Sequence, residues 1–179
     1  MQESSILMHK SIRRVQNRAV LGRGAVLHSS AAVVNGRGIL FLAPSGGGKS
    51  TTARALSQAD GEILGDDSTV VSLGTDGIWR MIPCAVFTWF TGERPSARAL
   101  DHLMILEKGE PAVLKRVNPA YACYRILREK SIMADQEMEP DERMVLRGTV
   151  KELCRIFPTH ILRWSKPDSL VELLSKVIE

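Results

Sequence analysis

One stretch of the sequence restricts the fold more than any other: an apolar run, a glycine-rich loop and a Lys-Ser pair that opens a helical pattern. Residues 39–42 are apolar and predict a buried strand, and the glycine loop (residues 43–48) follows at once. Successive backbone N–H groups can surround a phosphate only where no Cβ intrudes, and the start of a helix adds a positive dipole end. The stretch therefore predicts a phosphate-binding loop in an α/β fold, with Lys49 on the outer phosphates and Ser50 on Mg²⁺.

The residues expected to hold a nucleotide lie in and directly after the glycine loop. They are Ser45, Gly46, Gly47, Gly48, Lys49, Ser50 and Thr51. Ala43 stands at the first loop position, where this motif more often has glycine. The alternative interpretation is a Gly/Ser turn before an ordinary helix, with Lys49 in solvent.

Charge and composition limit the classes of partner. The chain of 179 residues has a net charge of +4, which suits anionic substrates such as nucleotides without indicating nucleic acid. Its three cysteines form no CxxC pair, so neither a disulfide framework nor a zinc site is expected, and a cytoplasmic location fits. No apolar run is long enough to span a membrane. We expect a single domain over residues 25–179, preceded by a basic flank over residues 1–24.

The order of patterns along the chain predicts a mixture of strands and helices. Residues 25–34 predict a strand that turns back at 35–38, so that a hairpin leads antiparallel into the glycine loop. Further strands are expected at 62–64, 68–73, 78–82, 102–106 and 160–164, and helices at 52–56, 119–128, 140–157 and from 167. Residues 83–95 and 129–139 are expected to be loops. The basic flank is interpreted either as a solvated segment or as an edge element that meets an acidic partner.

Two adjacent acids follow the short strand pattern at 62–64. One of Asp66 and Asp67 could hold Mg²⁺, while the other could accept the proton of an attacking hydroxyl group. A polar Gly-Asp-Asp turn without function is the alternative. His28 lies on the first strand pattern, where a lone histidine is more often packed or solvated than catalytic. Arg94 and Arg98 could bind phosphate or an acidic substrate, or could be solvated.

These positions together resemble the catalytic core of the HPr kinase/phosphorylase family, whose fold is related to that of phosphoenolpyruvate carboxykinase. The resemblance rests on the histidine-bearing hairpin at 27–42, the loop at 43–51 and the aspartate pair at 63–67. It implies a P-loop core with a mixed β-sheet flanked by helices, and amides of residues 45–50 that bind the phosphates of ATP. It further implies that Asp66 is the base beside His28, and that Ser50 and Asp67 place Mg²⁺.

The resemblance also bears on substrate and assembly. Residues matching the family's glycine-rich signature and its HPr-docking helix are not found in the sequence, so the expected acceptor is a hydroxyl group, first of all serine, on another protein, a peptide or a small molecule. Relatives in the family form hexamers, which makes a homo-oligomer possible.

The sequence leaves more than one functional class open. The first hypothesis is an ATP- and Mg²⁺-dependent kinase that transfers the γ-phosphoryl group to a hydroxyl group. The second is a nucleotide-binding accessory or sensor module that does not turn over, which needs only the loop and one acid. A third, an ATPase or GTPase switch, is weakened because the sequence contains no [NT]KxD motif.

Overall fold

The computed structural model describes residues 2–84, 95–129, 131–133, 135–164 and 167–178, and it contains two β-sheets and five α-helices within these ranges. The mixed α/β prediction is confirmed. No helix in the described ranges is both long and apolar enough to cross a membrane.

The larger sheet has six strands and carries the glycine loop. Its strand order is β4 (Glu62–Gly65), β2 (Ser29–Val34), β3 (Arg37–Leu42), β8 (His102–Glu107), β10 (Thr159–Arg163) and β9 (Val113–Val117). The three central strands β3, β8 and β10 are parallel, whereas β2, β4 and β9 pair antiparallel with their neighbours. The carboxyl ends of β3 and β8 therefore meet at one edge of the sheet.

The smaller sheet is antiparallel throughout the described residues. Its strand order is β1 (Gly24–Leu27), β5 (Thr69–Leu73), β6 (Trp79–Pro83) and β7 (Arg98–Ala99). Both sheets are joined by direct chain connections, from β1 to β2, from β4 to β5 and from β7 to β8.

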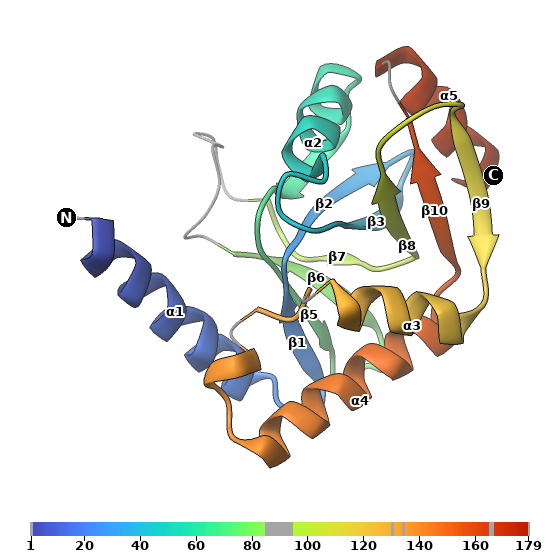
Figure 1. Ribbon diagram of the computed structural model, residues 1–179. Coiled ribbons are helices and arrows are strands. Elements are labelled where there is room, and N and C mark those ends of the chain that lie inside the picture. Colours follow the sequence, from blue (N-terminus) through green and yellow to red (C-terminus); the bar gives the residue numbers. More distant parts are fainter. Residues whose placement is uncertain (1, 85–94, 130, 134, 165–166, 179) are drawn as a thin grey trace.

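Helices cover both faces of the six-stranded sheet (Figure 1). The helices are α1 (Gln2–Ala19), α2 (Lys49–Gln58), α3 (Pro119–Arg128), α4 (Pro140–Ile156) and α5 (Pro167–Ile178). Helices α2 and α5 pack on one face, in a core with Phe41, Met104 and Leu162. Helices α3 and α4 lie on the other side, where they share a core with both sheets.

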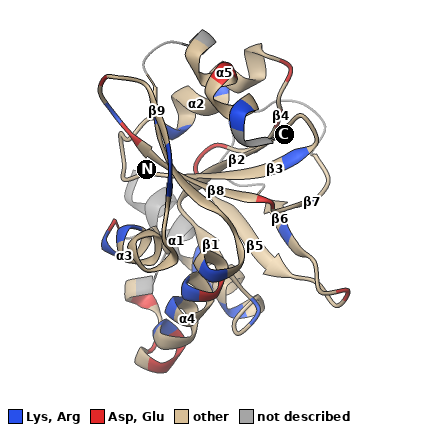
Figure 2. Cartoon of the chain, turned by 90° about the vertical axis from the view of Figure 1, so that its right-hand side faces the viewer, with Lys and Arg blue, Asp and Glu red and all other residues tan. Residues whose placement is uncertain are grey.

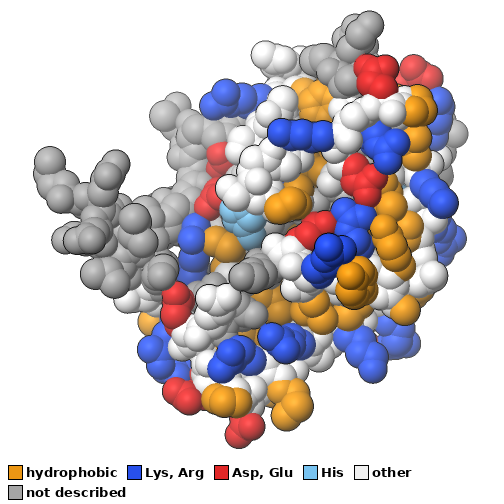
Figure 3. Space-filling model, viewed as in Figure 1, with side chains coloured by type: hydrophobic (Ala, Val, Ile, Leu, Met, Phe, Trp, Pro, Cys, Tyr) orange, Lys and Arg blue, Asp and Glu red, His pale blue; other side chains and the backbone are white. Residues whose placement is uncertain are grey.

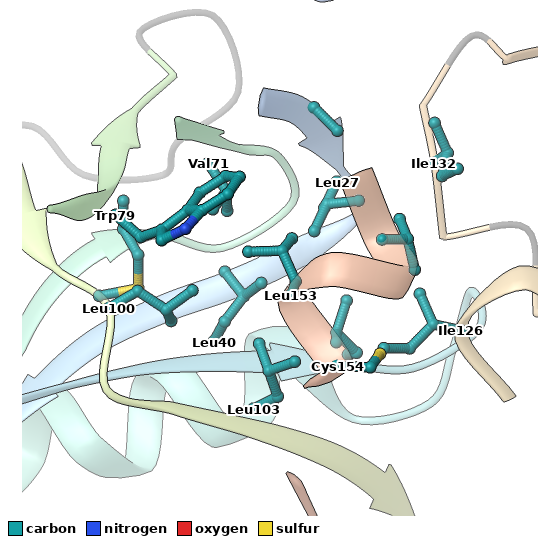
Figure 4. Close-up of a cluster of buried hydrophobic side chains, with 14 of the residues drawn as sticks. Leu27, Leu40, Val71, Trp79, Leu100, Leu103, Ile126, Ile132, Leu153 and Cys154 are labelled. Carbon is teal, nitrogen blue, oxygen red and sulfur yellow. The ribbon is translucent and has the colours of Figure 1, made fainter. Parts of the chain in front are cut away.

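Strand β3 is buried on both faces because side chains alternate along it. Ile39 and Phe41 face α2 and α5, while Leu40 and Leu42 join the core beneath α3 and α4. Figure 4 shows Leu40 beside Leu103 and Leu153, with Trp79 of the smaller sheet on the same cluster. In Figure 2 the charged residues lie mainly on helices and loops, and the middle of the larger sheet carries almost none. This continuous apolar run is what made the strand before the loop predictable.

The strand expected at residues 25–34 is instead two strands in two sheets, with His28 at the bend between them. The backbone N–H of His28 donates to the carbonyl of Ser131 at 2.7 Å, and β1 pairs with β5 while β2 pairs with β3 and β4. A strand-like sequence pattern predicts that a segment is extended, but it does not predict which sheet each part of the segment joins.

The loop expected at residues 129–139 has more structure than predicted. Ile132 forms an isolated antiparallel bridge with Leu27, and a short 3₁₀ helix spans Asp135–Glu137. Met138 is buried, although the segment around it is polar. The expected loop at 83–95 lies mostly outside the described residues. Strands β7 and β9 were not predicted, because neither has an apolar pattern.

Most of the basic flank forms the long helix α1 (Gln2–Ala19). Asn17 is fully buried, where its side chain accepts from Val26 N–H at 2.8 Å and donates to the Met133 carbonyl at 2.6 Å. Arg18 forms an ion pair with Glu142 of α4 at 2.8 Å. Helix α1 is therefore attached to β1, to the segment 131–133 and to α4.

Candidate functional site

The glycine loop leaves the carboxyl end of β3 and leads directly into α2. Beside it, the neighbouring parallel strand β8 ends at Glu107. Ligands of open α/β sheets commonly bind outside such strand ends. A cavity of about 300 Å³ lies here, and it is lined by His28, Ser45, Gly46, Gly48, Lys49, Ser50, Thr51, Asp67 and Lys108. On the face shown in Figure 3, basic, acidic and histidine side chains lie close together below α2.

The backbone of the glycine loop takes conformations that side chains disfavour. Gly46 and Gly48 have φ values of 72° and 99°, in the left-handed region where glycine carries no steric penalty. At Gly47 a Cβ would lie 2.6 Å from the Cβ of Ala43 and 2.8 Å from the carbonyl oxygen of Pro44. The three glycines thus place no side chain of their own over the backbone amides of the loop.

Helix α2 begins at the cavity without a capping side chain. Its N-cap residue is Gly48, which makes no side-chain cap hydrogen bond, and the first turn contains no acidic residue. The first amides of a helix lack intrahelical acceptors, and the helix dipole adds partial positive charge at the same end. Trp164 Nε1 donates to Thr52 Oγ1 at 3.2 Å, which ties the first turn of α2 to the end of β10. An anion at this helix start would meet unused donors.

Lys49 is almost completely buried, with 5% of its surface exposed, and its side chain folds back across the glycine loop. Its Nζ donates to the carbonyls of Ala43 at 2.9 Å and Pro44 at 3.1 Å. Burial lowers the pKa of Lys49 from its ordinary value, while the negative charges of Asp67 and Glu129 act in the opposite direction. In this arrangement the ammonium group stabilises the loop and lies next to the cavity.

Asp67 is the acidic residue that lines the cavity, and two basic side chains reach it from distant parts of the sequence. His28 Nδ1 lies 3.4 Å from Asp67 Oδ1, and Arg13 Nη2 donates to Asp67 Oδ2 at 2.8 Å. Burial, followed by the positive charge of Lys49, lowers the pKa of His28 below its ordinary value, and Asp67 only partly offsets this. His28 is therefore neutral at pH 7 and can accept or relay a proton.

Asp66 lies in the same turn but is buried, with 8% of its surface exposed, and it is not among the residues that line the cavity. Gly47 is likewise part of the loop without lining the cavity. The structure thus brings His28 against Asp67, whereas the resemblance pairs it with Asp66. Arg98 lies elsewhere, in an ion pair with Glu62 at 3.0 Å, and Arg94 falls outside the described residues.

The full length of the sequence, residues 1–179, matches the family model of the SynChlorMet cassette protein ScmC. The chain belongs to the ScmC family. The family's description names a cassette and states no activity. No curated protein matches the chain.

Among solved structures, the Hpr(Ser) kinase/phosphatase from Coxiella burnetii is similar to the ScmC-family chain. The two share 11% sequence identity over 85% of this chain and 95% of that chain, with a TM-score of 0.49. A similarity at this level assigns no activity to the ScmC-family chain.

Two basic residues at the site escaped the sequence analysis. Arg13 belongs to the basic flank, and nothing in its pattern distinguishes it from its basic neighbours. Lys108 follows β8 directly, and the only available signal was its place after the carboxyl end of a predicted strand. Glu107, the residue before it, is held by Arg125 at 2.7 Å and Arg163 at 2.9 Å, which fixes this strand end.

The oxygen donors at the cavity suit a hard cation that is coordinated partly by the protein and partly by a bound ligand. Ser50 and Asp67 offer a hydroxyl and a carboxylate, the oxygen donors that Mg²⁺ prefers. Within the described ranges, no group of three or more His, Cys, Asp or Glu residues could hold a metal by itself. Mg²⁺ typically uses one or two carboxylates together with phosphate oxygens and water, so the residues present fit it.

Proposed function

We propose that this chain is an ATP- and Mg²⁺-dependent kinase that transfers the γ-phosphoryl group to a hydroxyl group, first of all that of serine. One observation carries the proposal. The glycine loop, the buried Lys49 and the oxygen donors Ser50 and Asp67 all line one cavity, and His28 lines it as well. Phosphoryl transfer depends mostly on positioning and charge neutralisation, for which this combination is suited.

The glycine loop and α2 supply the phosphate side of the proposed site. Backbone amides of residues 45–51, apart from that of Gly47, which donates to the Pro44 carbonyl, donate to the phosphate oxygens, and the helix dipole favours their negative charge. Lys49 exchanges its two carbonyl acceptors for the outer phosphates, which are stronger partners for an ammonium group. Burial lowers the pKa of Lys49, and the negative charge of bound phosphates acts in the opposite direction, which favours the cationic form of the side chain.

Ser50 and Asp67 hold Mg²⁺ in the proposal. A bound Mg²⁺ would supply charge neutralisation at the phosphates. His28 orients Asp67 from the other side of the carboxylate, at the 3.4 Å separation of Nδ1 and Oδ1.

The transfer step assigns the proton to Asp66. The acceptor oxygen attacks the γ-phosphorus, a new O–P bond forms, and the bond from that phosphorus to the bridging oxygen of ADP breaks. The hydroxyl proton passes to the Asp66 carboxylate, and the bond electrons leave with ADP. This role requires Asp66, which is buried and is not among the residues that line the cavity, to come within hydrogen-bond reach of the acceptor.

Binding and turnover of the full-length chain test the proposal separately. Lys49→Ala is expected to weaken the binding of a fluorescent ADP analogue at least tenfold, because the analogue's phosphates lose their buried cation. Lys151→Ala removes an exposed lysine on α4 and serves as the matched control. Equal affinities for Lys49→Ala, Lys151→Ala and the unaltered chain would contradict a phosphate site at the glycine loop.

Asp66→Asn is expected to keep nucleotide binding and to lose phosphoryl transfer, measured with labelled ATP and candidate serine-containing acceptors. Asp67→Asn is expected to lose phosphoryl transfer and also the Mg²⁺ dependence of nucleotide binding. Full transfer by Asp66→Asn together with none by Asp67→Asn would exchange the two roles.

The second candidate is a nucleotide-binding accessory or sensor module. The observation that favours it is the position of Asp66 outside the cavity lining, since a binder needs only the loop and Asp67. Such a module binds ATP with the same dependence on Lys49 but produces no labelled acceptor and no ADP.

The remaining parts of the proposal concern partners and location. The acceptor is carried by a protein, a peptide or a small molecule, and ATP is the nucleotide. We place the activity in the cytoplasm, where ATP and Mg²⁺ are available, with a homo-oligomer as a possible assembly. We also keep residues 25–179 as one catalytic domain behind the flank 1–24.

A further inference from the structure

We propose that Arg13 of α1 is a built-in competitor of the divalent cation: its guanidinium occupies Asp67, and cation binding displaces it. This inference rests on the proposed function, because it concerns the cation that Asp67 would hold. The inference gives helix α1 a role at the candidate site, although no sequence motif links this helix to the glycine loop.

A basic side chain lies beside each of the two carboxylate oxygens of Asp67. Arg13 Nη2 is 2.8 Å from Oδ2, and His28 Nδ1 is 3.4 Å from Oδ1. The Asp67 side chain is 41% exposed and lines the cavity, so a cation arriving with a nucleotide can reach it. The guanidinium thus provides the positive charge that a cation would otherwise supply.

Helix α1 presents Arg13 from a fixed position. One turn further along the helix, Asn17 is fully buried and bound to β1 and to the segment 131–133. Residues four apart share one face of a helix, so Asn17 holds the face from which Arg13 extends. The Arg18–Glu142 ion pair adds a second attachment, to α4. Displacement of Arg13 therefore needs only a change of its long side chain, while the helix stays in place.

Electrostatics gives the direction of the effect. A unit positive charge within a few ångströms of a divalent cation repels it, and the guanidinium also uses a carboxylate oxygen that the cation needs. Lys49 and His28 act near the same carboxylate, but neither donates a hydrogen bond of ordinary length to it. Removing the charge of Arg13 should therefore tighten cation binding, whereas a residue that merely supports Asp67 would have the opposite effect when removed.

Mn²⁺ serves as the probe for the test, because free aqueous Mn²⁺ can be counted by its electron paramagnetic resonance signal. The full-length chain is titrated in the absence of nucleotide. Arg13→Gln is expected to lower the dissociation constant for Mn²⁺ about threefold to tenfold at low ionic strength, with a smaller gain at high salt. Arg13→Lys keeps the charge and is expected to stay nearer to the unaltered chain.

Two controls assign the effect to the contact itself. Arg18→Gln removes the same charge from the same helix, but from a residue paired with Glu142, and should leave the dissociation constant unchanged. Asp67→Asn should remove the gain, so that Asp67→Asn and the Arg13→Gln/Asp67→Asn double variant bind Mn²⁺ equally weakly. Circular dichroism and urea unfolding of each variant check that α1 remains folded.

Three outcomes overturn the inference: an unchanged or weaker Mn²⁺ affinity in Arg13→Gln, an equal gain in Arg18→Gln, or no Mn²⁺ binding by any variant. The proposed function is tested apart from this, by binding of a fluorescent ADP analogue in EDTA, where no divalent cation takes part. If Arg13→Gln gives no gain in Mn²⁺ affinity but the analogue still binds, the Arg13 inference is wrong and the proposed phosphate site is supported. If the analogue does not bind but Arg13→Gln binds Mn²⁺ more tightly, the phosphate site is wrong and the Arg13 inference is supported.

Discussion

Gly47 shows how little room the glycine loop has for a side chain. A Cβ at this position would lie within 2.8 Å of two neighbours, the Ala43 side chain and the Pro44 backbone, neither of which can rotate away. Its N–H also donates to the Pro44 carbonyl at 2.9 Å and closes the turn. The residue is therefore constrained by packing, in contrast to Gly46 and Gly48, which are constrained by their φ angles.

Gly47→Ala should consequently distort the loop. We expect a loss of about 1–3 kcal/mol in the free energy of unfolding, as for overpacked sites, measured by urea denaturation, together with weaker binding of a fluorescent ADP analogue. Gly148→Ala is the matched control. That glycine lies within α4, where a Cβ would meet no atom within 4 Å, and alanine is the better helix former, so stability should rise by about 0.5–1 kcal/mol. Equal effects at the two glycines would contradict the packing argument.

At the scale of elements, α1 is the helix whose contacts were least predictable from the sequence. Its attachment depends on the buried amide of Asn17, which bridges the start of the smaller sheet and the segment before the 3₁₀ helix. Buried polar groups contribute to stability only while their hydrogen bonds are made, and they are costly once a partner is removed.

Asn17→Ala should therefore cost about 2–3 kcal/mol in the free energy of unfolding, since it leaves the Val26 N–H and the Met133 carbonyl without their side-chain partner. Urea denaturation followed by circular dichroism measures this change. Val15→Ala on the same helix, at a side chain 67% exposed, should change stability by less than about 0.5 kcal/mol. A small effect for Asn17→Ala would mean that α1 is held mainly by other contacts.

Local patterns were sufficient where local chemistry decides the structure. The apolar run, the glycines and Lys49 predicted a strand, loop and helix because burial and backbone conformation are both written in adjacent residues. Strand β9 was missed because it is an edge strand in which Lys115 and Arg116 are exposed and the other side chains are half-buried, so it has no apolar alternation.

Long-range contacts at the candidate site could be predicted only in part. The aspartate pair and His28 were singled out as candidates, but their sequence positions do not say which carboxylate the imidazole meets. Arg13 was not identified, since its contact depends on how α1 packs through Asn17, a polar residue that amphipathic patterns do not register as core.

At the scale of the whole molecule, three histidines respond to pH in the same direction. Burial is the largest cause of the lowered pKa of His28, His102 and His160, and the rings of His102 and His160 lie 6.2 Å apart between their centroids. When the pKa is lower in the folded chain, the unfolded chain binds more protons in acid. Their contribution to stability is thus complete above about pH 6.5 and is lost as the pH falls.

The melting temperature should accordingly decrease between pH 7 and pH 5, where carboxylates with lowered pKa values such as Glu107 remain ionised. Differential scanning fluorimetry in buffers of matched ionic strength measures the change. The double variant His102→Gln/His160→Gln should show a shallower decrease, because it removes two of the three groups and leaves the candidate site untouched. The same slope in both chains would mean that burial of these two rings has little effect on their proton affinity.

The bend at His28 lies on the line where the two sheets meet. The chain crosses from one sheet to the other at His28 and crosses again at the Asp66–Asp67 turn, and these two crossings lie side by side because β1 pairs with β5 and β2 with β4. The ribbon formed by these four strands is therefore folded along a line marked by the two side chains that meet at 3.4 Å. We therefore expect a change in the angle between the two sheets at this line to change the distance between the His28 imidazole and the Asp67 carboxylate as well.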